Sequence, residues 1–133
     1  MSAEINEEKN EVDLLVHKVG SVALADDRLI PDWDSLAITA ILRDHSGSVN
    51  WFTYQGEARP RPGSPSDGQL HDTFRELRDA MNKRDGGQHW KACLVKIKKI
   101  DMSIQIEFEY ENENRWKVTP ATVKTLPEEL RPK

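Results

Sequence analysis

The sequence contains few of the residues and motifs on which common catalytic sites are built. It has one cysteine, Cys93, which excludes an internal disulfide and a cysteine-rich metal site. None of its four histidines forms a metal-binding pair such as HExxH. P-loop, GxGxxG and GxSxG motifs are also missing. We therefore expect no cofactor, no bound metal and no enzymatic activity.

Long apolar runs are missing as well, so we expect no contact with a membrane. Residues 1–11 are acidic and lack the apolar core of a signal peptide, which favours a cytoplasmic protein. The formal net charge of -4 disfavours direct binding of nucleic acid and allows a basic protein partner. The length of 133 residues suits one domain, residues 1–133, and leaves open whether its acidic N-terminal end and its C-terminal tail are flexible.

Apolar residues recur at helical spacing in two segments. The first runs from about residue 3 to residue 25. The second, residues 70–81, precedes Gly86, a natural helix stop. Ser66 and Gln69 have the spacing of a capping box, so we expect this helix to begin between them.

The segment "SLAITAILRDHSGSVNWFTYQ", residues 35–55, predicts a β-hairpin with a two-residue turn at Ser46-Gly47. That turn predicts one cross-strand pair on each face: Leu42 with Trp51, and Ile41 with Phe52. Both faces are apolar. One should pack on a helix, and the other needs a cover from this chain, from a partner or from a second copy in a homodimer.

The alternating segment "SIQIEFEYENE", residues 103–113, predicts the second strand of another hairpin, after residues 89–100. One face of this hairpin should be apolar, with these residues together: Cys93, Val95, Ile97, Ile104, Ile106, Phe108 and Tyr110. The other face should carry Lys96 and Lys98 with the glutamates, and either lysine should be opposite or diagonal to Glu107.

Two segments rich in proline complete the chain. Residues 56–68, "GEARPRPGSPSDG", predict a partly extended loop. In the tail, Thr119 and Pro120 predict the cap and first residue of a short helix that Pro127 limits. The resulting order is α-β-β-α-β-β-α. We expect an α+β domain with an antiparallel sheet of about four strands, from two hairpins, packed with helices.

Three carboxylates share the polar face of the last strand: Glu107, Glu109 and Glu111. A solvated face with a lysine–glutamate ladder is the first explanation. A docking surface for a basic partner is the second. Acid–base catalysis by Glu107 or Glu109 with a histidine is the weakest, because nothing in the sequence places the carboxylates in different environments.

Trp51 and Tyr54 lie on the first hairpin, which has a surplus apolar face. The chain's own tail covers this face, or a partner does. Exposed aromatic residues beside carboxylates are typical of protein interfaces. We therefore take Trp51 and Tyr54, together with the three glutamates, as candidate partner-binding residues.

The order of elements and several local phrases resemble the YezG-type immunity proteins of bacterial polymorphic toxin systems. The phrases are "SLAITAILRDHSGSVNWFTYQG", "LHDTFRELRDAM" and "HWKACLVKIKKIDMSIQIEFEYEN", with "EFEYEN" and "RWKVTP" the most distinctive. The resemblance covers roughly residues 5 to 131. The tail "TPATVKTLPEELRPK" is longer than the endings typical of the family.

The resemblance implies a small cytoplasmic antitoxin that binds and occludes a cognate protein toxin made by the same cell. Such toxins are often nucleases with basic clefts, which an acidic inhibitor suits. A non-enzymatic adaptor or regulatory module that binds peptides is the alternative.

Overall fold

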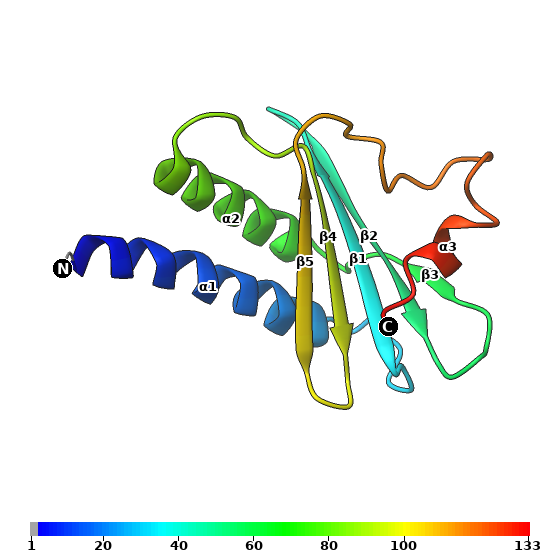
Figure 1. The fold of residues 1–133 in the computed structure, drawn as a ribbon. Coiled ribbons are helices and arrows are strands. Elements are labelled where there is room, and N and C mark those ends of the chain that lie inside the picture. Colours follow the sequence, from blue (N-terminus) through cyan, green and yellow to red (C-terminus); the bar gives the residue numbers. More distant parts are fainter. Residues whose placement is uncertain (1–2) are drawn as a thin grey trace.

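The structure is a computed structural model that describes residues 3–133; the side chains of residues 3–10 and 85 lie outside the description. It contains three helices: α1 (Ala3–Leu24), α2 (Gln69–Asp85) and the short α3 (Leu126–Glu129). Helices α1 and α2 lie together on one side of a sheet, and the C-terminal tail with α3 runs along the other side (Figure 1).

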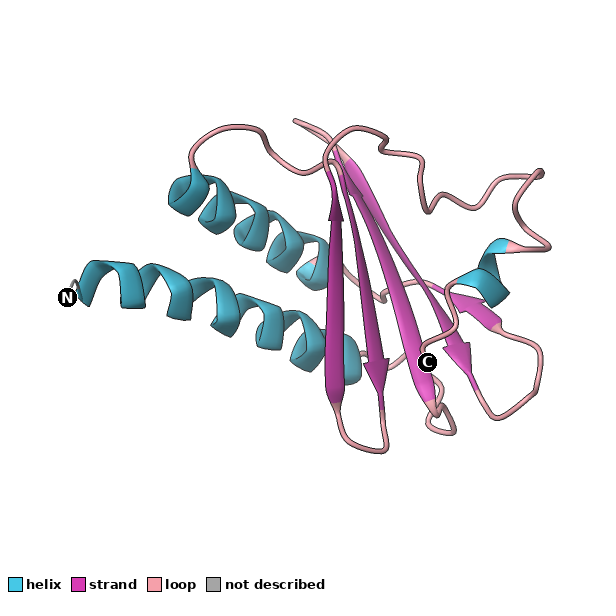
Figure 2. Ribbon diagram, viewed as in Figure 1, coloured by secondary structure: helices cyan, strands magenta, loops and turns pink. Residues whose placement is uncertain are grey.

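The sheet has five strands in the order β3-β2-β1-β4-β5, and every neighbouring pair is antiparallel. Its strands are β1 (Ser35–Leu42), β2 (Gly47–Tyr54), β3 (Arg61–Gly63), β4 (Ala92–Lys98) and β5 (Ser103–Glu109). The α+β prediction is confirmed, and β1 and β4 join the two hairpins into one sheet (Figure 2).

The extra strand, β3, comes from the predicted loop. It pairs with the second half of β2, where Pro62 is opposite Phe52. Proline is tolerated on an edge strand because its missing N–H costs no bond on the open side. The sequence signals of proline and glycine were therefore compatible with a short edge strand as well as with a loop.

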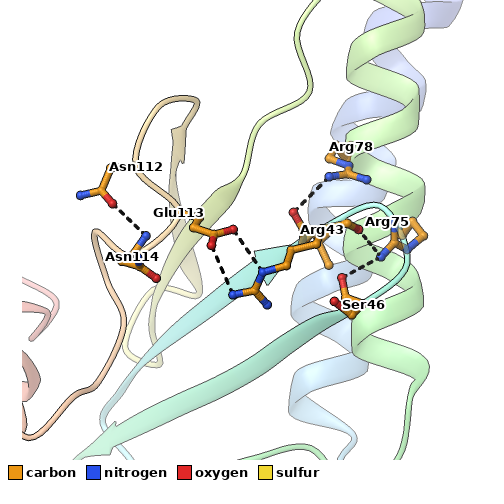
Figure 3. A network of polar contacts seen from close by, with 8 residues as sticks. Arg43, Ser46, Arg75, Arg78, Asn112, Glu113 and Asn114 are labelled. Carbon is orange, nitrogen blue, oxygen red and sulfur yellow. Dashed lines mark hydrogen bonds and ion pairs between the residues drawn. The ribbon is translucent and has the colours of Figure 1, made fainter.

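The predicted turn of the first hairpin is wrong. Leu42 pairs with Gly47, and Trp51 pairs with Ile38, so residues 43–46 form the connection. Arg75 of α2 stabilises this longer turn by donating to the carbonyl oxygens of Arg43 at 3.1 Å and Ser46 at 3.3 Å (Figure 3). The two faces of each strand are nevertheless as predicted, because the register differs by an even number of residues.

The first core lies between the sheet and the two long helices. From α2 it takes the predicted stripe of Leu70, Phe74, Leu77 and Met81. The predicted face of the second hairpin is confirmed, since Cys93 pairs with Phe108, Val95 with Ile106 and Ile97 with Ile104. Lys96 pairs with Gln105 and is therefore diagonal to Glu107, also as predicted.

The predicted capping box of α2 is wrong. The helix begins at Gln69 with Gly68 as its N-cap, and no side chain caps it. Ser66 instead donates its backbone N–H and its hydroxyl to Asp26, at 2.8 and 3.1 Å. These two bonds tie the loop to the turn that follows α1. Gly86 ends the helix as predicted, with a positive φ of 61° and its N–H donated to the Asn82 carbonyl.

A second core lies on the opposite face of the sheet, under the tail. Trp116, Leu126 and Leu130 pack there on residues of three strands: Ala37, Ile41, Phe52, Tyr54, Ala92 and Leu94. The cover that this apolar face required thus comes from the chain itself.

The predicted boundaries of the tail helix are wrong. Residues 119–125 form turns in which Thr122 accepts the N–H of Thr119 at 2.8 Å, and α3 begins only at Leu126. Pro127 lies in the first turn of α3 and does not limit a preceding helix. Proline fits there because the first N–H groups of a helix have no partner within it.

Candidate functional site: the acidic edge at β5

The candidate site is the polar face of β5, the last strand of the sheet. Among residues 3–133, β4 is the only strand neighbour of β5, so the main-chain groups on the outer side of β5 carry no ladder hydrogen bonds there. Its apolar residues Ile104, Ile106 and Phe108 pack against the first core. Alternation therefore directs the side chains of Gln105, Glu107 and Glu109 to the side of the sheet on which the tail lies.

Glu109 is built into the turn that follows the strand. Its carboxylate accepts the backbone N–H groups of Glu111 at 3.0 Å and Asn112 at 3.1 Å, and a bond from Arg115 at 3.1 Å. These backbone hydrogen bonds, with Arg115 adding to them, hold the pKa of Glu109 below its usual value. Glu109 thus organises the loop and is only partly free to meet a partner.

Glu107 and Glu111 are more accessible. The side chain of Glu107 is 55% exposed and lies 3.9 Å from Arg115, and Glu111 is exposed at the start of the turn. Glu107 and Glu109 form ion pairs with Arg115, whereas the sequence predicted pairing with lysines of β4. Arg115 also stacks on Trp116, 4.7 Å from the ring centroid. This arginine links the acidic face to the second core.

The two candidate aromatic residues are buried. Trp51 is 2% exposed and belongs to the first core, while Tyr54 is 1% exposed and belongs to the second. The Tyr54 hydroxyl donates to the Pro127 carbonyl at 2.6 Å, and Arg131 lies 4.8 Å from the ring centroid. Neither ring is presented to a partner, and neither lies with the glutamates of β5. The structure assigns Tyr54 to holding the tail.

The part of the chain that the structure describes contains neither a metal-binding cluster nor a membrane-spanning helix. Its histidine, cysteine and acidic residues form no group of three that could hold a metal ion. No helix there combines the length and apolar character needed to cross a bilayer. Cys93 is fully buried, and burial raises the pKa of its thiol well above the usual value, as expected for an unreactive side chain.

Sequence reasoning missed Arg115 and the surface beneath the tail. Arg115 follows a run of asparagine and glutamate residues, and nothing in that run says that the chain turns back onto β5. The tail encloses a hollow of about 1020 Å³ against β1, β2 and β3. Its lining residues come from four separate stretches of the chain, so no local sequence pattern predicts the hollow.

The chain matches no protein-family model and no curated protein sequence.

Proposed function

We propose that this protein is an immunity protein that binds a cognate bacterial toxin and blocks it by occlusion. The observation that carries the proposal is the acidic edge at β5. It combines an unpaired strand edge with exposed carboxylates at Glu107 and Glu111. The resemblance to YezG-type immunity proteins is a second, independent reason for the proposal.

An edge strand of this kind suits a protein partner. A partner strand can add to the open side of β5 through main-chain hydrogen bonds, which require no special side chains. The adjacent carboxylates then favour basic partners and speed their approach. A toxic nuclease with a basic cleft has the complementary charge.

Occlusion needs no chemistry from the inhibitor. The toxin would lose access to its substrate because the immunity protein covers the basic surface that the substrate needs. The same edge could serve an adaptor with a housekeeping partner, and the identity of the partner separates these two functions.

The test is co-expression with a toxic domain, sought first in the gene directly upstream. We expect growth to be restored, a stoichiometric complex to be recovered, and the toxin in that complex to keep its original mass. A complex with unchanged toxin mass supports occlusion over enzymatic inactivation. Failure of the purified proteins to associate, together with unrelieved toxicity, would contradict the immunity function.

A further inference from the structure

The hollow beneath the tail has the dimensions of a ligand-binding pocket. Its volume of about 1020 Å³ lies at the upper end of the range for small-molecule sites, about 300–1,000 Å³. The floor is the face of β1 and β2, with Ile41 and Phe52 as its apolar part. The tail supplies the opposite wall through Trp116, Val118 and Val123.

The apolar wall is partly open to solvent. Val118 is 40% exposed and Val123 is 49% exposed, although both line the hollow. The hydrogen bonds of residues 117–125 run within the tail, mainly in the turns around Thr122. A ligand with an apolar body would cover these side chains and remove them from water.

A cross-strand pair of polar residues lies on the floor of the hollow. Thr39 and Asn50 are paired across β1 and β2 and share the face toward the tail. Thr39 is only 6% exposed, and its hydroxyl, which bonds to none of the described residues, still reaches the solvent in the hollow. A ligand that enters the hollow would replace water as the hydrogen-bond partner of this hydroxyl.

The charge around the hollow is positive, in a protein whose formal net charge is -4. Arg59, Lys117 and Lys124 lie around it, and within the described part of the chain none of the three has an ion-pair partner. The remaining charged lining residues are engaged: Arg43 with Glu113 at 3.3 Å, and Glu128 with Arg131 at 2.8 Å. Three cations are thus free to meet an anion.

From these observations we infer that the hollow binds an amphipathic organic anion, with a carboxylate head and an apolar body. The head would accept hydrogen bonds from Thr39 and Asn50 and lie near the cations. The body would pack between Phe52 and the tail. An added peptide strand is disfavoured over most of the floor, because β1 is paired on both sides and residues 51–53 of β2 are paired with β3. This inference does not depend on the proposed immunity function.

The experiment is a calorimetric titration of the full chain with decanoate, with decyltrimethylammonium as a probe of equal chain length and opposite charge. We expect saturable one-to-one binding of decanoate, and binding of the cation at least tenfold weaker. Acetate, which has the head without the body, should not saturate. Equal binding of the two decyl probes would overturn the inference, since it would reflect apolar contact alone.

Variants locate the site. Lys117→Glu/Lys124→Glu should weaken decanoate binding at least tenfold and invert the charge preference. The control Lys18→Glu/Lys83→Glu makes the same change in net charge on the helices across the sheet and should leave the affinity within about twofold. Thr39→Val, close in shape, should weaken binding severalfold. Equal losses in both double variants would overturn the inference. It would also be overturned if the wild-type chain did not bind decanoate and Lys117→Glu/Lys124→Glu abolished binding of a protein partner.

Discussion

The two ends of the sheet differ in how their surfaces are made. At the β5 end, one strand with alternating residues supplies an acidic, solvated face. At the β3 end, residues of β1, β2, the loop before β3 and the tail together enclose a basic hollow. The first surface depends on local sequence and the second on tertiary structure. A net charge of -4 therefore conceals two regions of opposite sign.

The comparison also shows what the tail does. It covers the apolar face of the first hairpin, forms one wall of the hollow and sends Arg115 to the acidic strand. The hollow therefore needs the tail as a wall, and the acidic face needs it only for Arg115, the ion-pair partner of Glu107 and Glu109. Variants that loosen the tail should disturb both regions, whereas variants of surface charge should disturb one at a time.

The largest effect is expected from Trp116→Ala. Trp116 is buried in the second core, and removing a buried tryptophan typically costs about 3–5 kcal/mol. Urea denaturation should show this loss of unfolding free energy. Phe74→Ala, in the first core, is the matched comparison and should cost a similar amount. A loss below about 1 kcal/mol for Trp116→Ala alone would mean that the tail is not part of the stable structure.

A smaller effect is expected from Tyr54→Phe. This change removes the hydrogen bond to Pro127 and should cost about 1 kcal/mol at neutral pH. Burial raises the pKa of Tyr54 in the folded protein, so above the ordinary tyrosine pKa of about 10 the unfolded chain loses a proton that the folded chain keeps. Stability contributed by Tyr54 is therefore full below pH 10 and falls as the pH rises.

Denaturation of both proteins from pH 8 to pH 11 checks this second prediction. The wild type should lose stability more steeply above about pH 10 than Tyr54→Phe. Buried Cys93 shifts in the same direction in both proteins, so it cancels in the comparison. Parallel curves would mean that Tyr54 is accessible to water and that the tail opens readily.

The fold was largely predictable, and the errors share a cause. Alternation placed Phe108 and Cys93 on one apolar face because a slip of one residue would bury lysines. It did not decide the turn at Gly47, because both faces of that hairpin are apolar and an even shift preserves them. Arg75, from a helix far along the chain, contributes to the longer turn.

The candidate site was predictable in part. The polar face of β5 follows from its own sequence, and Glu107 is exposed as predicted. The burial of these two aromatic residues could not be predicted locally, because the first core covers Trp51 and the tail, more than 60 residues away, covers Tyr54. Pairing of Glu109 with Arg115 depends on the turn at Asn112, which no periodic pattern encodes.

The measurement that tests the central claim most directly is the affinity of the purified chain for the proposed toxin partner, with Glu107→Lys/Glu111→Lys compared against Asp72→Lys/Asp79→Lys. Both double variants change the net charge equally, but the control lies on the exposed side of α2. If β5 is the binding edge, the first variant should weaken binding at least tenfold and flatten its salt dependence, while the control stays within about twofold. Equal losses in the two variants, or none in either, would contradict it.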